Sequence, residues 1–344
     1  MTQKSNKRMP AEWERHGVVL LAWPHSQTDW AYMLEEVQEC YHRIIDSITE
    51  AGEHVILLAP AHERPEIEHP QVTVVSVDTN DTWIRDYGPL TLEDEEDGIE
   101  LLDFRFNGWG LKFASNFDNQ VNKHLGLRHV YAHRPTCMKQ MVLEGGSIES
   151  DGKGTLLTTA CCLLAPNRNE PMTRAQIDAA LKEQLHADRV LWLEHGALTG
   201  DDTDGHIDTL CRLAPDDTIV YTGCHDSGDE HFETLQAMAR QLRTFTTKEA
   251  QPYNLVELPL PSAIYNPEDG SRLPATYANY LVLERAVLMP SYNQPMNDKL
   301  AADTLRIVYP DREIIQVDCR ALIRQHGSLH CATMQVPTQA ISFL

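Results

Sequence analysis

The chain alternates short apolar runs, each long enough for one buried strand, with segments that carry a helical pattern. Continuous apolar stretches of this length are typical of strands that are covered on both faces. Such stretches occur at 18–23, 54–59, 72–77, 99–106, 154–159, 218–223, 281–289 and 313–318. Candidate helices lie between some of them, at 31–51, 173–187, 231–243 and 297–308. The alternation predicts an α/β fold.

The helical segments carry recognisable end signals. The apolar side chains of 31–51 fall on one stripe, and Gly52 follows as a stop signal. For 297–308 we expect Asn297 to be the N-cap. The strand-helix modules recur about every 60–70 residues, which is compatible with pseudo-symmetry. No low-complexity linker interrupts the chain, so we expect a single domain over 1–344.

The charge balance narrows the range of partners. Fifty-one acidic and 29 basic side chains give a formal net charge of −22. Nucleic-acid binders need clustered Lys and Arg, so no nucleic-acid partner is expected. An acidic surface attracts cationic solutes, although acidity also serves solubility alone. No apolar stretch reaches about 20 residues, and we expect no membrane partner.

The cysteines and the N-terminus bear on location. The N-terminus lacks the apolar centre of a secretory signal, so we expect a cytoplasmic protein. The eight cysteines form no CxxC pair and are expected to be thiols. The sequence leaves homo-oligomerisation open.

A first candidate for chemistry is NDTWIRDYGPL, residues 80–90. Asp86 and Trp83 lie close to a predicted strand end. A carboxylate beside an aromatic ring suits a flat cation, because the acid accepts paired N–H bonds and the ring stacks. The alternative is that Arg85 and Asp86 form a surface ion pair that closes a turn.

A second candidate is LEGGSIESDGKGTLL, residues 143–157. The turn-rich segment 150–154 predicts a β-hairpin. Glu144 precedes two glycines, where backbone can approach a ligand closely. Whether Glu144 does more than begin the hairpin stays open at this point.

A third candidate is GDDTDGHIDTL, residues 200–210. A calcium-loop alignment fails, because Gly200 and Cys211 would stand at its first and last ligand positions. A zinc site would need a second ligand group, and neither HExxH nor a cysteine pair is present. His206 and Asp208 remain. On an extended segment they would project to the same face as a base and a carboxylate.

The fourth candidate is HGSLHCATMQVP, residues 326–337. Cys331 lies between a turn and a β-like run. Most cysteines are packing residues, and a nucleophile needs a His and a carboxylate brought to it from elsewhere in the chain. Neighbouring His330 does not decide the question, since adjacent residues on a strand point in opposite directions.

These segments together closely resemble the agmatine deiminases, within the wider family of Porphyromonas-type peptidylarginine deiminases. The resemblance covers almost the whole chain. The matching segments are MPAEWERHGVVLLAWPH (9–25), WIRDYGP, FNGWGLKF (106–113), LEGGSIESDGKGTLLTT, CLLAPNRN (162–169), DTDGHID (202–208), PATYANY (274–280) and HGSLHCATMQ.

The resemblance implies a five-bladed α/β-propeller, the pentein fold, with five pseudo-symmetric strand-helix modules around a central site. It implies deimination of a small cationic guanidinium substrate, without a metal or cofactor. The matched positions imply the following roles: Cys331 as nucleophile, His206 as general acid/base, Glu144 as the acid that orients it, Asp86 and Asp208 as the carboxylates that hold the guanidinium, Trp83 as a pocket wall, and Asn279 as a polar residue near the site.

One segment departs from the family pattern. Many relatives read GGGNIHC before the nucleophile, whereas this chain reads QHGSLHC with His326 and Ser328. We expect agmatine, converted to N-carbamoylputrescine and ammonia, as the substrate. The alternatives are a peptidyl- or free-arginine deiminase and, in a different class, a non-catalytic guanidinium-binding or ribosome-associated protein on the same fold.

Overall fold

The structure is a computed structural model that describes residues 7–14, 17–94 and 98–344. It is an α/β protein, as predicted, and its described strands form five separate sheets. In hydrogen-bonded order, the first sheet consists of β16 (Thr333–Pro337), β1 (Gly17–Ala22), β2 (His54–Ala59) and β3 (Val72–Ser76). The second sheet consists of β4 (Leu90–Glu93), β5 (Ile99–Arg105) and β6 (Thr136–Val142), and the third of β7 (Ile148–Ser150), β8 (Thr155–Thr159) and β9 (Arg189–Leu193). The fourth consists of β10 (Cys211–Ala214), β11 (Thr218–Gly223) and β12 (Asn254–Pro259), and the fifth of β13 (Leu281–Val282), β14 (Ala286–Ser291) and β15 (Glu313–Asp318).

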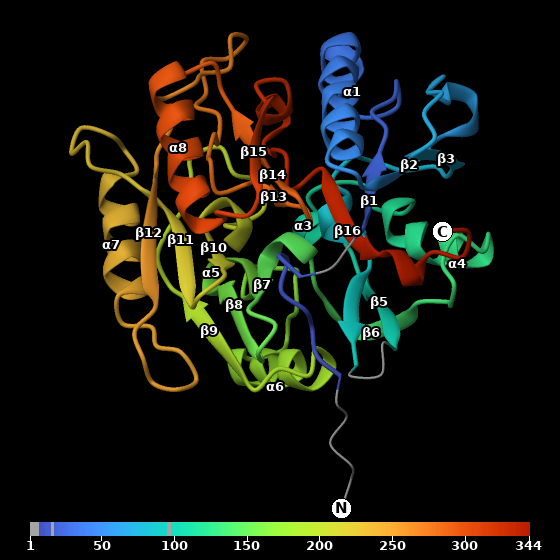
Figure 1. Cartoon of the computed structure of the whole chain (residues 1–344). Helices are drawn as coiled ribbons and strands as arrows, with labels where there is room; N and C mark the ends of the chain where they lie inside the picture. Colours follow the sequence, from blue (N-terminus) through green and yellow to red (C-terminus); the bar gives the residue numbers. More distant parts are fainter. Residues whose placement is uncertain (1–6, 15–16, 95–97) are drawn as a thin grey trace, which may run out of the picture.

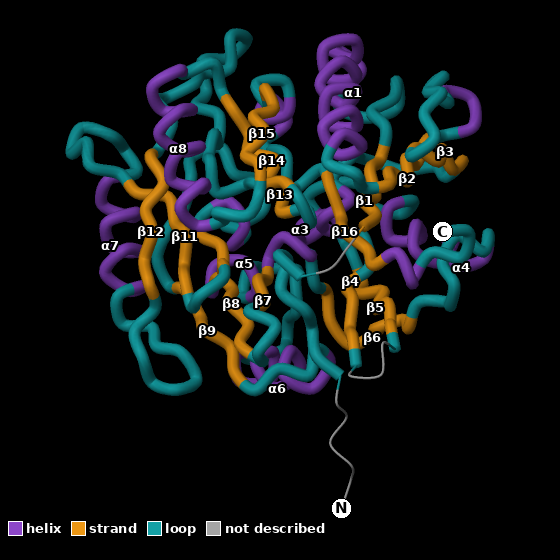
Figure 2. The backbone as a smooth tube through the Cα atoms, viewed as in Figure 1, coloured by secondary structure: helices purple, strands orange, loops and turns teal. Residues whose placement is uncertain are grey.

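The five sheets repeat one pairing pattern. The first strand of each, in the order just given, is antiparallel to the second, and the second is parallel to the third. Parallel neighbours cannot be joined by a tight turn, so each parallel pair needs a long crossover. Figure 2 shows purple helical segments within these crossovers.

The longer helices supply the crossovers and lie on the outside of the molecule (Figure 1). They are α1 (Leu34–Glu50), α4 (Val121–Leu127), α6 (Arg174–Gln184), α7 (Phe232–Leu242) and α8 (Pro295–Val308). Shorter helical turns are α2 (Ile84–Tyr87), α3 (Gly108–Leu111), α5 (Ala160–Leu163), and the 3₁₀ turns η1 (Ala31–Met33), η2 (Ala61–Glu63), η3 (Asp118–Gln120), η4 (Gly145–Ser147), η5 (Ile207–Thr209), η6 (Leu322–Gln325) and η7 (Thr338–Ala340). No helix in the described ranges is long and apolar enough to span a bilayer.

The two ends of the chain meet in one sheet. Strand β16 pairs antiparallel with β1, with Val336 opposite Val18 and Met334 opposite Leu20. All five residues of β16 are buried. The C-terminal strand therefore completes the sheet that the N-terminal strand begins.

Most predicted elements are present. Strands β2, β11 and β15 have the predicted bounds, and the hairpin around 150–154 is the antiparallel pair β7–β8. The run 281–289 is not one strand: it folds back on itself as the short antiparallel pair β13–β14. The charged pair Glu284–Arg285 lies exposed in that turn.

The predicted start of the last helix was wrong. Helix α8 begins at Pro295, with Gln294 rather than Asn297 in the cap position. Proline favours the first turn, because its missing N–H is not needed there and its φ is already helical. Asp298 then accepts from the Gln294 backbone N–H at 2.7 Å.

Candidate active site

Five loops, each directly before the first strand of a sheet, carry the predicted site residues. Asp86 precedes β4, Glu144 precedes β7, His206 and Asp208 precede β10, Asn279 precedes β13, and Cys331 precedes β16. All six side chains are buried. The repeated pairing pattern thus delivers one loop per sheet to a common centre.

Cys331 lies at this centre. Its Sγ is 3.7 Å from Asp208 Oδ2 and 3.2 Å from Asn279 Nδ2. The Asn279 side-chain oxygen also accepts from the backbone N–H of His330 at 2.9 Å. Asn279 therefore fixes the backbone that presents the thiol.

The environment of the empty site favours the neutral thiol. Burial, and then the negative charges of Asp208 and Asp86, raise the pKa of Cys331 well above its ordinary value. A cation placed between the thiol and these carboxylates would oppose this effect, because it stabilises the thiolate.

Asp208 is held through one of its two oxygens. His330 Nδ1 lies 2.7 Å from Asp208 Oδ2, while Oδ1 is buried without a partner. Burial raises the pKa of Asp208, but the hydrogen bond and charge of His330, with His206 and Arg212, hold it below its usual value overall. Asp208 is consequently an ionised acceptor with one oxygen available.

Asp86 is held by backbone and by an indole. Gly146 N–H donates to its Oδ1 at 3.0 Å, and Trp109 Nε1 donates to its Oδ2 at 2.9 Å. Burial raises the pKa of Asp86 to about 6, and the Trp109 hydrogen bond works against that rise. The alternative of a surface Arg85–Asp86 pair was wrong, since both are buried and Arg85 instead donates to Gln335.

Glu144 forms an ion pair with Arg168, for which the sequence predicted no role. Arg168 Nε donates to Glu144 Oε1 at 2.7 Å, and both side chains are almost fully buried. Arg168 Nη2 also donates to the carbonyl of Thr203 at 2.9 Å, in the loop that leads to His206. Glu144 Oε2 is buried without a partner. The sequence signal was the CLLAPNRN match, which assigned no role to Arg168.

His206 is fully buried, and neither ring nitrogen has a hydrogen-bond partner. Its Nδ1 lies 3.5 Å from Asp86 Oδ1, and a ligand atom of His206 lies within 4.8 Å of a carboxylate oxygen of Glu144. The extended segment expected for His206 and Asp208 was wrong: His206 caps the 3₁₀ turn η5, and Asp208 lies inside it. A buried imidazole without partners, close to two carboxylates, is available for proton transfer.

A pocket with an empty volume of about 450 Å³ opens onto Cys331 and Asp86. Aromatic side chains and acidic side chains line much of it. Among its lining residues are Trp83, Trp109, Phe113, Asp29, Asp81 and Asp202. No described lining residue is Lys or Arg.

The two residues that depart from the family pattern take different places. His326 lines the pocket with a left-handed φ of 67°, a conformation that favours glycine, and its Nδ1 lies 2.7 Å from the carbonyl of Gly200. Ser328 is buried, and its Oγ lies 2.9 Å from the Tyr292 hydroxyl. Only His326 of the pair therefore lines the pocket.

Among the described residues, two groups of side chains have ligand-like spacing for a metal ion. In Glu144, Cys162 and His206, the Arg168 guanidinium already occupies one carboxylate oxygen, so the group is already paired with a cation. The other group, Glu12, Glu149 and His330, encloses the Arg212 guanidinium. Neither donor set fits a metal ion.

Comparison with known proteins gives the family. The sequence model of the Porphyromonas-type peptidyl-arginine deiminases matches residues 8–337. The chain belongs to this family.

Relatives with different assigned substrates resemble the chain over nearly its full length. An agmatine deiminase from Stutzerimonas stutzeri is 30% identical over 96% of this chain and 95% of its own. A structure of a candidate arginine deiminase from Porphyromonas gingivalis is 45% identical, with a TM-score of 0.90 over 97% of this chain and 99% of its own. A C. jejuni agmatine deiminase variant with substrate bound is 37% identical, with a TM-score of 0.88 over 96% of each chain.

Proposed function

We propose that the chain hydrolyses agmatine to N-carbamoylputrescine and ammonia. The choice of substrate depends on the lining of the pocket. This lining contains acids and aromatic rings but no described Lys or Arg. The ammonium tail of agmatine suits such a lining. The α-carboxylate of free arginine would need a basic partner.

Asp86 and Asp208 hold the guanidinium in this proposal. The plane of a guanidinium presents its N–H groups in fixed directions, so two carboxylates can fix its orientation for attack. Asp208 has an unpartnered buried oxygen for this contact. Asp86 lines the pocket.

The bound cation also activates the nucleophile. Asp208 and Asp86 oppose ionisation of Cys331 in the empty site. A guanidinium between them offsets both negative charges, so the thiol loses its proton more easily once substrate is bound. His206, with two free nitrogens, accepts that proton.

The thiolate then attacks the guanidinium carbon and forms a C–S bond. Protonated His206 donates its proton to a leaving nitrogen, the C–N bond breaks, and ammonia departs from an amidino-thioether on Cys331. His206 next removes a proton from water, which attacks the same carbon. The C–S bond breaks, and His206 returns the proton to sulfur. Glu144 stabilises the imidazolium in both halves.

We also propose that residues 1–344 form one catalytic domain with five blades. The support is the repeated antiparallel-then-parallel pairing in five sheets, and the delivery of one loop from each sheet to the centre. This arrangement corresponds to the α/β-propeller that the resemblance implies.

Substrate preference is tested by offering agmatine, free arginine and an arginyl peptide to the purified protein and measuring ureido formation. We expect agmatine to have the highest kcat/KM. A higher value for either arginine compound would assign the chain to the alternative substrate class.

Catalysis is separated from binding by the Cys331→Ala variant. We expect turnover to be abolished, while calorimetry still detects agmatine, since Asp86 and Asp208 are unchanged. Cys211→Ala, at another buried cysteine, is the control and should retain turnover. Unchanged turnover in Cys331→Ala would remove Cys331 from the mechanism, and absence of turnover in the unaltered protein would favour a binding protein.

A further inference from the structure

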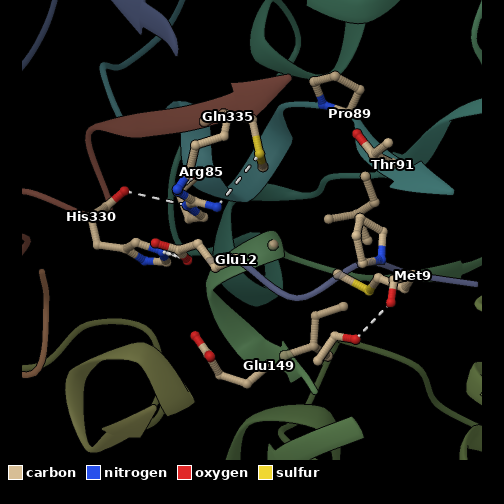
Figure 3. A pocket seen from close by; sticks show the side chains of 14 residues that line it. Met9, Glu12, Arg85, Pro89, Thr91, Glu149, His330 and Gln335 are labelled. Carbon is tan, nitrogen blue, oxygen red and sulfur yellow. Dashed lines mark hydrogen bonds and ion pairs between the residues drawn. The ribbon is translucent and has the colours of Figure 1, made fainter. Parts of the chain in front are cut away.

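His330, the neighbour of the nucleophile, lies between two carboxylates on opposite sides of its ring. Its Nδ1 is 2.7 Å from Asp208 Oδ2, and its Nε2 is 2.7 Å from Glu12 Oε2. Figure 3 shows His330 and Glu12 against each other in a second pocket. This pocket is lined by Met9, Glu12, Arg85, Glu149 and His330 among others, and it shares no lining residue with the substrate pocket.

Both ring contacts of His330 are made with carboxylate oxygens, which accept hydrogen bonds. Both carboxyl groups have pKa values below their usual range. Burial opposes this lowering, but the charge of Arg212 and the bond to His330 dominate for Glu12, and His330 dominates for Asp208. His330 therefore links two buried carboxylates, one residue from the thiol.

Arg212 strengthens this arrangement. Its Nη2 donates to the same oxygen of Glu12 and lies 3.1 Å from His330 Nε2. Its Nε donates to Glu149 on β7. Glu12 Oε2 is therefore in contact with both Arg212 and His330.

Glu12 reaches the centre on a segment that crosses several sheets. Figure 1 shows this N-terminal segment passing β7 on its way into the molecule. Met9 O accepts from Ser150 at 2.9 Å on β7, and Arg8 N–H donates to the Glu93 carbonyl at 2.8 Å on β4. Glu12 Oε1 accepts from the Val282 N–H at 3.0 Å on β13. The segment is thus fixed to three of the five sheets.

We propose that Glu12 is a positioning residue that fixes the ring of His330, so that His330 holds one oxygen of Asp208 and leaves the other for the guanidinium. This proposal rests on the proposed function, because it assigns Asp208 to the substrate. Glu12, His330 and Asp208 do not line the substrate pocket, but Asp208 Oδ2 lies 3.7 Å from the Sγ of Cys331, which does. Glu12 and His330 therefore act on the substrate through Asp208.

The test compares Glu12→Gln, His330→Gln and the double variant with the unaltered protein. We expect each single variant to raise the KM for agmatine about tenfold, as expected when a charge-assisted contact loses its alignment. The double variant should be no worse than His330→Gln alone, because Glu12 acts through His330. Effects that multiply in the double variant would overturn the proposal.

Glu14→Gln is the matched control. Glu14 lies on the same segment and accepts from Ala11 N–H at 2.7 Å and from Arg8, but it does not touch His330. Its replacement should leave KM unchanged. An equal rise in KM for Glu14→Gln would show that Glu12 only anchors the segment.

A second readout does not depend on the substrate. Peptide mapping after treatment with iodoacetamide gives the alkylation rate of Cys331. We expect this rate to fall several-fold in Glu12→Gln and not in Glu14→Gln, because the charge of Asp208, no longer held by His330, opposes ionisation of the nearby thiol more strongly. If the protein failed to convert agmatine, the proposed function would fail, and this rate would still decide the role of Glu12. Equal rates in all variants would refute it.

Discussion

At the scale of single residues, two of the carboxylates at this centre share one device. A fixed donor occupies one oxygen of Asp208 and one of Glu144, and the second oxygen remains unpartnered. The donors are His330 and Arg168. A buried carboxylate would otherwise rotate or take up a proton, so such donors fix both geometry and charge.

Arg168 provides a direct test of this device. Replacement by Met removes the buried ion pair with Glu144, and we expect kcat to fall about 10²-fold, because in the proposed mechanism Glu144 must keep its place to orient His206. Unfolding measurements should show a loss of about 3–5 kcal/mol, because one partner of a buried ion pair is removed. Arg168→Met combined with Glu144→Gln should recover stability but not kcat. Full activity of Arg168→Met would show that Glu144 needs no partner.

Trp109 contributes to the charge state of Asp86, with a predictable pH effect. Burial raises the pKa of Asp86 to about 6, and in the proposed mechanism the ionised form binds the cation, so kcat/KM should fall as pH decreases through about 6. The indole hydrogen bond lowers this pKa. Trp109→Phe should therefore move the low-pH fall in kcat/KM to higher pH. Trp83→Phe changes the same pocket but removes no bond to Asp86, so it should leave this fall at the same pH. A shift in both variants would contradict the assignment of this fall to Asp86.

The sequence could predict which segments meet at the candidate site, but not the partners that hold their side chains in place. Cys331, His206 and Asp86 stand in segments whose turn residues and reactive groups are visible locally. Arg168 is 24 residues from Glu144, and Trp109 is 23 residues from Asp86. No periodicity links such partners, since loops from different sheets bring them together.

At the scale of elements, the turn η4 brings backbone against the site. The amide of Gly146 donates to Asp86, and this close approach leaves no room for a side chain. A Cβ at Gly146 would lie 2.7 Å from His206 Nδ1, 2.8 Å from Asp86 Oδ1 and 3.1 Å from Asp208 Oδ2. Glycine is required there by space.

We therefore expect Gly146→Ala to lose more than 10²-fold in kcat/KM, since three site groups must move. Circular dichroism should still show the native fold. Gly228→Ala is the control: its added methyl would meet only Asp226, at 3.2 Å, in an exposed turn. Near-normal kinetics for Gly146→Ala would mean that these groups tolerate displacement.

Apolar runs predicted the strands well, but they could not reveal a reversal inside a run. In 281–289 a turn of two exposed residues separates two short strands. The conformations of the loops that precede β10 and β16 were harder still to predict from the sequence. Their 3₁₀ and turn geometry is imposed by contacts such as the Asn279 oxygen that holds the backbone of His330 and Cys331.

At the scale of the whole molecule, the fold depends on its last strand. Strand β16 covers one edge of β1, and its residues are buried. Removal of 333–344 would expose that edge and the apolar side chains beneath it. We expect the shortened protein to be insoluble or unfolded by circular dichroism.

Deletion of Phe343 and Leu344 is the matched control, because both are half-exposed at the end of the chain. This variant should keep its melting temperature within a few degrees. Normal folding after removal of the whole strand would show that β1–β3 suffices on its own.

The order of the site residues along the chain also determines when the candidate site can form. Cys331 follows Asp86, Glu144, His206, Asp208 and Asn279 in the sequence, so the ribosome synthesises the thiol after these groups. Folding during translation proceeds from the N-terminal side. A copy terminated before residue 331 would contain the acids of the candidate site but not the thiol. The complete site therefore forms only after the segment that carries Cys331 has been made.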